Sequence, residues 1–377
     1  MMEFLLAQTP HTTGEVIKDF INQALQPAWF FAMAVTALAI FLLGYRFFTK
    51  PRVALLAAIA AAVGFGLSML DEDFLKIVTK ADNVPIVMML MGVGFCLWLA
   101  FRQAAINDER TEKGQPLLEA GSDDKVLVWP DLVYVELIAL VLCTAFLIVW
   151  AIVLRAPLEQ PADPSTIPNP SKAPWYFLGL QELLVYFDPW IAGVLLPGLI
   201  VVGLISIPYI DRNPKGNGYY TFKERPFAIT SYMLGFVIMW VLLIVFGTFL
   251  RGPNWNFFGP FEYWDDQKPV ALVNLQFYEL FWVKILGGGE PAGWSKTFAF
   301  LPRELPGLLF MFGYFFIMPV ILAVTVFKKL YKQMGVPRYA TFMVLFTWTA
   351  IVPLKMVLRW TIDFKYFVNI REYFFNI

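Results

Sequence analysis

Histidine is almost absent from this chain of 377 residues, in which His11 is the only one. A single imidazole excludes any site that needs several, such as a pair of bis-histidine haems, which requires four. The two cysteines, Cys96 and Cys143, lie in apolar runs and cannot supply an iron–sulfur cluster held by four thiolates. The formal net charge is zero, so the charge balance gives no indication of a nucleic-acid partner or of an acidic substrate.

Charged residues are also scarce, at 15% of the chain against roughly 25% in a soluble domain. Hydrophobic residues make up 59% and aromatic residues 17%. A membrane-spanning helix needs about 20 mainly apolar residues. We therefore predict an all-α, polytopic transmembrane protein with about eight spans. The spans are expected near Pro27–Phe48, Arg52–Leu70, Val84–Ala104, Leu132–Val153, Trp190–Ile210, Ile229–Leu250, Leu305–Phe327 and Tyr339–Trp360.

Basic residues are concentrated in every second connection between these spans. Since short cytoplasmic loops carry an excess of Lys and Arg, these connections are predicted to be cytoplasmic and both termini to lie on the outer side. The loop between spans four and five is then on the outer side as well. The basic residues follow spans one, three, five and seven and are Arg46, Lys50 and Arg52; Arg102, Arg110, Lys113 and Lys125; Arg212, Lys215, Lys223 and Arg225; and Lys328, Lys329, Lys332 and Arg338.

The chain divides into three predicted regions. Residues 1–128 hold three spans without interior His, Asp, Glu or Lys, which indicates packing or partner contact rather than chemistry. They end in a polar linker, residues 107–125, whose composition is typical of a partly mobile segment. Residues 129–252 hold spans four to six. Residues 253–377 hold an outer aromatic loop, expected to form a structured cap, two further spans and an aromatic tail.

Two cations lie near the outer end of the last predicted span. Lys355 and Arg359 are long side chains whose stems can follow apolar surface while the charged ends reach water. We expect both to extend to the membrane interface in this way.

The loop Pro161–Tyr176, PADPSTIPNPSKAPWY, is the most distinctive motif. Its prolines cannot continue a helix and stiffen the backbone. The following stretch, Trp175–Phe187, combines aromatic residues with Gln181 and Glu182 at a membrane edge, which predicts a short interfacial helix roofing an apolar pocket. A quinone ring and tail require a pocket of this kind. The alternative is an ordinary anchor helix, because Trp and Tyr are common at membrane interfaces.

This region resembles the C-terminal half of cytochrome b, which in plastoquinol complexes is a separate chain called subunit IV. The resemblance rests on the sequences WPDLVYVELIALVLCTAFLIVWAIVLRAPLEQPADP, KAPWYF and TFKERPFAIT. It implies a membrane subunit of a bacterial bc-type quinol:cytochrome c oxidoreductase, in the cytoplasmic (inner) membrane, with an outer-side quinol-oxidation site. The quinol would be menaquinol or ubiquinol.

The resemblance also implies partners, because the family holds its b haems with histidine pairs that this chain lacks. They are a haem-bearing N-terminal cytochrome b chain, a Rieske iron–sulfur protein, a c-type cytochrome and membrane lipid, in a dimeric complex. The KAPWY sequence is a variant of the commoner PEWY loop. The residues expected to contact quinol are Pro174, Trp175, Tyr176, Phe177 and Leu180.

The variant loop lacks the family's usual proton acceptor, because Pro174 stands where the glutamate would be. Glu182 is the nearest carboxylate in the same element, and an apolar setting is expected to raise its pKa and suit it to proton transfer. Asp188 is a second candidate, for proton exit, unless it caps a helix.

Two other functions stay open from the sequence. A non-catalytic membrane scaffold of a respiratory redox complex is the first, since the usual glutamate is missing. Quinol oxidation sensitive to outer-site inhibitors would argue against it. A transporter is the second, but its spans would need interior charges or paired broken helices, and the sequence shows no such pairing.

Overall fold

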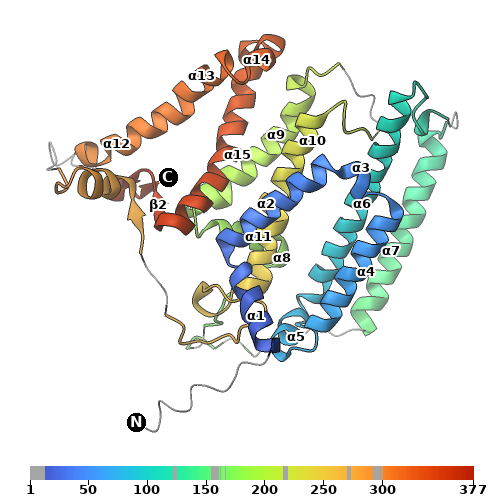
Figure 1. The fold of residues 1–377 in the computed structure, drawn as a ribbon, viewed down its shortest axis with the longest axis horizontal. Helices are drawn as coiled ribbons and strands as arrows, with labels where there is room; N and C mark the ends of the chain where they lie inside the picture. Colours follow the sequence, from blue (N-terminus) through green and yellow to red (C-terminus); the bar gives the residue numbers. More distant parts are fainter. Residues whose placement is uncertain are drawn as a thin grey trace, which may run out of the picture.

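The computed structural model describes residues 13–121, 125–153, 161, 163–165, 167–214, 220–269, 273–291, 298 and 300–377. These residues are mostly helical, with only two short pairs of strands among them (Figure 1). Within the described residues, seven helices are long and apolar enough to cross a membrane, or up to eight if the bent pair α1 (Thr13–Ala24) and α2 (Pro27–Leu43) forms one span. The predicted all-α polytopic class is confirmed.

The spans lie close to their predicted positions because each contains a long, mainly apolar stretch. Most of them begin with proline in the first turn, where the missing N–H has no helical partner to lose. The seven spans are α4 (Pro51–Ser68), α6 (Val84–Glu112), η3 and α7 (Val128–Leu132, Val133–Val153), η4 and α9 (Ile191–Leu195, Leu196–Ile210), α10, η5, α11 and η6 (Pro226–Met233, Leu234–Val241, Leu242–Val245, Phe246–Leu250), α12, η9 and α13 (Phe300–Phe312, Gly313–Ile317, Met318–Val324) and α15 (Val336–Ile362).

The first predicted span is interrupted at both ends. α1 and α2 meet at an angle of 78° just before Pro27. At the other end, α2 stops at Leu43 and α3 (Tyr45–Phe48) follows Gly44. A Cβ atom at Gly44 would lie 2.8 Å from Cε2 of Phe48, so a larger residue at the break would require the Phe48 ring to move.

Short elements complete the fold. Outside the spans lie α5 (Glu72–Val78), α8 (Trp175–Leu183), α14 (Lys328–Met334) and the helical turns η2 (Glu119–Gly121), η7 (Pro253–Trp255), η8 (Glu279–Ile285) and η10 (Arg371–Tyr373). Strand β1 (Leu275–Gln276) pairs in parallel with β2 (Phe364–Tyr366), and β3 (Asn369–Ile370) pairs antiparallel with β4 (Phe375–Asn376).

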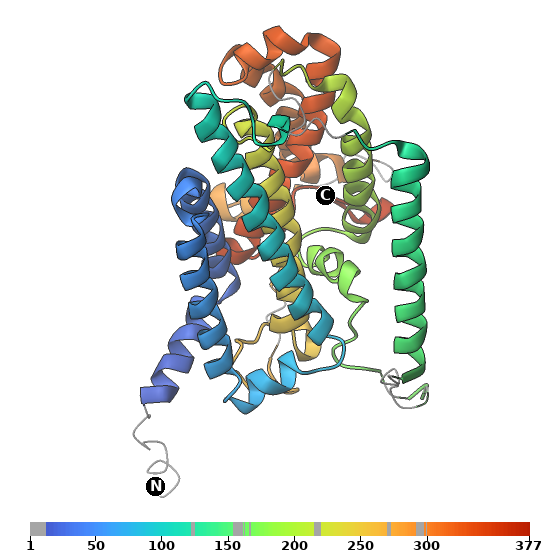
Figure 2. The ribbon, with the colours of Figure 1, turned by 90° about the vertical axis from the view of Figure 1, so that its right-hand side faces the viewer.

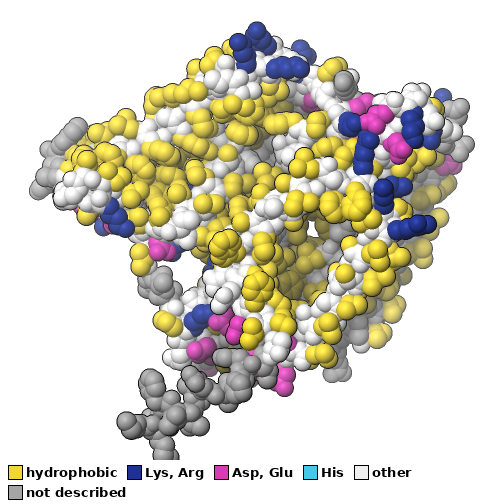
Figure 3. Space-filling model, viewed as in Figure 1, with side chains coloured by type: hydrophobic (Ala, Val, Ile, Leu, Met, Phe, Trp, Pro, Cys, Tyr) yellow, Lys and Arg dark blue, Asp and Glu magenta, His cyan; other side chains and the backbone are white. Residues whose placement is uncertain are grey.

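The basic connections meet at one end of the bundle. Arg46 donates two hydrogen bonds to Glu112, at 2.9 and 2.8 Å, and Lys223 forms an ion pair with the same carboxylate. Arg338 Nε donates to the carbonyl oxygen of Tyr209 at 2.9 Å, which joins the fourth connection to the third. Figure 3 shows Lys and Arg side chains gathered along the top and upper right, over α14 and α3. The opposite end carries α1, α5 and the approach to α8.

The first part of the linker predicted to be partly mobile is helical. Asn107 and Asp108 are buried and belong to α6, which continues past the predicted end of the span to Glu112. Asp108 accepts hydrogen bonds from Tyr45 Oη at 2.7 Å and from the backbone N–H of Phe222 at 3.1 Å. The carboxylate of Asp108 is therefore hydrogen-bonded by residues of two other connections rather than by water.

The largest core lies where α8, α11, α15 and the C-terminal strands meet. Tyr186, Phe187, Leu243, Met356 and Phe364 are all buried in it. By contrast, α7 stands apart from the other spans (Figure 2), and none of its residues is buried. Its apolar surface is left for lipid or for another chain to cover.

Candidate functional site

The helix predicted after the proline-rich loop is present as α8, which begins directly after Pro174. Pro174 stands at its N-cap, and the helix ends at Leu183 rather than Phe187. Gln181 fastens the loop to the helix with two bonds. Its Oε1 accepts from the backbone N–H of Ala173 at 2.8 Å, and its Nε2 donates to the carbonyl oxygen of Ser171 at 2.9 Å. The KAP segment is thus held by a side chain of the helix that it precedes.

Helix α8 lies close against the sixth span because a glycine allows the contact. A Cβ atom at Gly247 would lie 3.0 Å from the carbonyl oxygen of Leu178. Beside it, Lys172 Nζ donates to the carbonyl oxygen of Thr248 at 2.7 Å. Loop and helix are therefore both attached to the end of this span.

The residues expected to contact quinol are placed on two sides of α8. Tyr176 and Phe177 are 48% and 49% exposed, Trp175 is 38% exposed, and Pro174 is exposed as well. Leu180 packs instead against the buried core. The expectation of a pocket roofed by this helix is not met by the described residues of this chain, since the aromatic rings are open rather than enclosed.

Glu182 does not lie in the apolar setting predicted for it. It is fully buried, and Arg251 donates to both of its oxygens, from Nε at 2.9 Å and from Nη2 at 2.6 Å. Trp255 Nε1 donates at 3.2 Å and Tyr186 Oη at 3.1 Å. A carboxylate has about four acceptor positions, so all of them are occupied. The apolar prediction was wrong because Arg251, 69 positions away, brings a charge into the same space.

Arg251 is a residue of the candidate site that the sequence did not indicate. Burial lowers its pKa, but the charge and hydrogen bonds of Glu182 outweigh burial, and the net pKa is raised. The paired N–H···O geometry is the strong form of this interaction. Arg251 Nη1 also donates to the carbonyl oxygen of Trp255 at 3.0 Å. The ion pair therefore connects α8 to the turn after the sixth span.

A second link joins that turn to the loop before α8. Asn254 N donates to Asn169 Oδ1 at 2.6 Å, and Asn169 Nδ2 donates back to Asn254 Oδ1 at 3.1 Å. Asn254 and Trp255 have φ values of 56° and 57°; asparagine adopts this left-handed conformation readily, whereas a bulky residue such as Trp255 needs surrounding contacts to hold it. The turn is thus shaped to meet both the loop and Glu182.

Asp188 has weaker partners than Glu182. Its Oδ1 accepts from Tyr366 Oη at 3.4 Å and from Asn376 Nδ2 at 3.5 Å, and its side chain caps no helix. Lys365 Nζ donates to the carbonyl oxygens of Leu184 and Val185, at 3.0 and 2.8 Å, which satisfies the end of α8. The C-terminal segment therefore holds the far end of the helix.

Lys355 contradicts the expectation that it extends to the interface. It is fully buried, and its Nζ lies 4.4 Å from the centre of the Phe187 ring, without a hydrogen-bond partner among the described residues. Arg359 is the cation that lies at the surface, where it donates to the carbonyl oxygens of Val273 and Asp363. The two differ because aromatic rings of the C-terminal segment enclose only Lys355.

The donor set does not fit a haem. Within the described residues, no three His, Cys, Asp or Glu side chains are grouped as metal ligands, and His11 lies outside those residues. The chain purified alone should therefore give no b-type spectrum with a bis-histidine signature. Absorption and electron paramagnetic resonance spectra of the isolated chain test this. A bis-histidine signal would rule out the prediction that the b haems are bound by a separate partner chain.

Residues 161–261 match the family described as cytochrome b (C-terminal)/b6/petD. The matched segment includes the proline-rich loop, α8, Glu182 and Arg251. No solved structure matches the chain. A cytochrome b C-terminal-type domain is therefore present, and it supports a membrane subunit of a cytochrome b/b6-type redox complex.

Proposed function

We propose that this chain is the membrane subunit of a bc-type quinol:cytochrome c oxidoreductase that forms part of the outer-side quinol-oxidation site. The observation that carries the proposal is the position of α8 within the family match. Its aromatic side chains are exposed, while the Glu182–Arg251 ion pair fixes the helix from its buried side. An exposed aromatic face on a rigid support suits a planar ring that another chain encloses from the other side.

In this proposal the quinol ring lies against Trp175, Tyr176 and Phe177, beside the backbone fixed by Pro174. Oxidation releases two electrons and two protons. A Rieske iron–sulfur protein and a haem-bearing cytochrome b chain take the electrons, and a c-type cytochrome follows. The uncovered surface of α7 suits the membrane contact with such a partner chain.

Glu182 fits a positioning role better than that of proton acceptor. Its acceptor positions are all occupied, and it shares the buried face of α8 with Leu178, one turn earlier. Asp188 is the proposed proton exit, because its two hydrogen bonds are long and its side chain is only partly buried.

Replacing Tyr176 by Leu tests the quinol site. Loss of one aromatic contact in the transition state should lower kcat/KM for quinol about tenfold. The measurement is inhibitor-sensitive cytochrome c reduction by the complex purified with its haem-bearing partner. Tyr209→Leu is the matched control, since Tyr209 is exposed at the basic end of α9. Unchanged turnover in Tyr176→Leu and in Trp175→Leu would favour the alternative of a non-catalytic scaffold.

We also propose that α8 and both termini face the outside of a bacterial cytoplasmic membrane. The support is the meeting of the basic connections at the opposite end of the bundle. With Cys96 and Cys143 replaced by Ser, Ser165→Cys should react with an impermeant thiol reagent added to intact cells. Lys332→Cys should react only after the membrane is opened. The reverse pattern would overturn both the orientation and the outer-side assignment.

A further inference from the structure

We propose that a cavity beside the loop before α8 binds a phosphate group, carried by an anionic phospholipid or present as free phosphate. The cavity measures about 220 Å³ and lies between three elements far apart in the sequence. One is α5 with the turn after it, the second is the loop around Lys172, and the third is the turn at Trp264. This inference does not depend on the proposed quinol chemistry.

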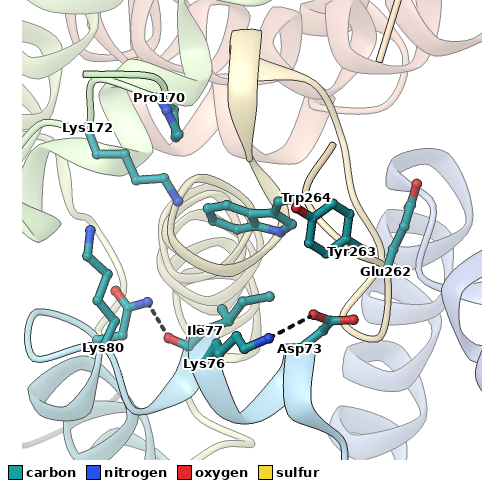
Figure 4. A pocket seen from close by; sticks show the side chains of 10 residues that line it. Asp73, Lys76, Ile77, Lys80, Pro170, Lys172, Glu262, Tyr263 and Trp264 are labelled. Atoms are coloured by element: carbon teal, nitrogen blue, oxygen red, sulfur yellow. Dashed lines mark hydrogen bonds and ion pairs between the residues drawn. The ribbon is translucent and has the colours of Figure 1, made fainter. Parts of the chain in front are cut away.

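The cavity brings cations together from two of these elements. Figure 4 shows the amines of Lys80 and Lys172 pointing into the space between them, Lys80 from the α5 side and Lys172 from the loop. Lys80 has one carboxylate nearby, Asp82, at 3.6 Å. The hydrogen bond from Lys172 to Thr248 goes to a neutral carbonyl. A bound anion would supply the negative charge that Lys172 lacks.

The carboxylates that line the cavity already have partners. Asp73 lies 3.8 Å from Lys76. Glu262 forms an ion pair with Lys268 at 2.5 Å and accepts the backbone N–H of Gly259 at 2.9 Å. These partners compensate part of their charge, so they neither pair with Lys172 nor exclude an external anion.

Trp264 provides an independent indication of a ligand. Its Nε1 is buried without a hydrogen-bond partner among the described residues, although its ring lines the cavity. A buried donor left unpaired costs roughly 1–3 kcal/mol, and a phosphate oxygen would satisfy this one once a small rotation of the indole presents Nε1 to the cavity. Lys172 Nζ lies 4.9 Å from the centre of the same ring, so the indole and the amine are close to one another.

The electrostatics agree with this geometry. Burial, and then the charge of Lys80, lowers the pKa of Lys172 to about 7, while Glu182 acts in the opposite direction. An anion between the two lysines would reverse the repulsion and favour the charged amine. Bound phosphate would also join α5, which follows the second span, to the loop that precedes α8.

The test compares binding to the full chain in detergent with three variants. Lys80→Gln removes a largely exposed charge, and Trp264→Phe keeps the ring but removes the donor. Lys329→Gln, an exposed lysine of α14 at the opposite end, is the control. One arm measures retention of phosphatidylglycerol against phosphatidylcholine by native mass spectrometry. The other titrates inorganic phosphate and follows it by phosphorus NMR.

We expect Lys80→Gln and Trp264→Phe each to weaken the binding of one probe about tenfold, because each variant loses one hydrogen bond to a charged group. Lys329→Gln should leave the binding of both probes unchanged. A loss confined to phosphatidylglycerol identifies a lipid headgroup, and a loss with inorganic phosphate identifies the free ion. If both probes bind the two cavity variants as tightly as the control, the proposal is wrong.

Discussion

Replacing Arg251 by Met should lower the free energy of unfolding by about 3–5 kcal/mol, because it leaves the buried charge of Glu182 without its partner. It should also abolish quinol oxidation, since α8 loses its attachment to the turn after the sixth span. Thermal unfolding of the purified complex measures the first effect. Arg212→Met, an exposed arginine at the basic end, should change stability by no more than about 0.5 kcal/mol.

A double variant separates the ion pair from simple loss of packing. Arg251→Met combined with Glu182→Leu removes both charges and replaces them with apolar side chains. Buried ion pairs exchanged for apolar groups of similar volume are often neutral in stability. The double variant should therefore be markedly more stable than Arg251→Met alone. Equal loss in the two would mean that the pairing with Glu182 is not what stabilises this part of the chain.

Glu182→Gln should lower quinol oxidation about 10²-fold, because a shift of about 1 Å in the support of a site can cost that much. The change keeps the size of the side chain but leaves Arg251 as an unpaired buried cation. Quinol:cytochrome c turnover of the complex measures the effect. Quinol affinity should change less, since the aromatic face of α8 is left intact.

The double variant Glu182→Gln with Arg251→Gln, which carries neither charge, distinguishes a positioning role of Glu182 from a role as proton acceptor. If Glu182 acts by positioning α8, removing both charges should restore turnover to within about tenfold of the natural chain, because the unpaired charge is gone. A positioning residue can be rescued in this way, whereas a group that accepts the quinol proton cannot. Turnover that stays about 10²-fold low in a stable double variant would return the role of proton acceptor to Glu182.

Local patterns allowed the spans and α8 to be predicted from the sequence. Apolar runs such as Leu132–Val153 specify a spanning helix by length alone, and Pro174 followed by an aromatic stretch specifies where α8 begins. The break at Gly44 was less visible, because the sequence on both sides of it is one continuous, mainly apolar run.

The immediate surroundings of the candidate site could not be predicted in the same way. The setting of Glu182 depends on Arg251 and Trp255, which reach it only after the sixth span has returned to α8. At the end of a span, an arginine is equally compatible with an interfacial position. Lys355 was misjudged for a related reason, since the Phe187 ring beside it is far away in the sequence and Tyr366 reaches it only because the chain turns back after α15.

The burial of Asp108 has a consequence for how the chain could be divided. Asp108 accepts a hydrogen bond from Phe222 N, and Asn107 donates one to the carbonyl oxygen of Tyr220. These two bonds attach α6 to the connection before α10. They do not depend on the peptide segment that joins α6 to α7. A chain cut after Gly121 should therefore yield two polypeptides that remain noncovalently associated in the membrane. The same function could then be encoded as two separate chains, with the surface of α6 that binds residues 220–223 acting as a subunit contact.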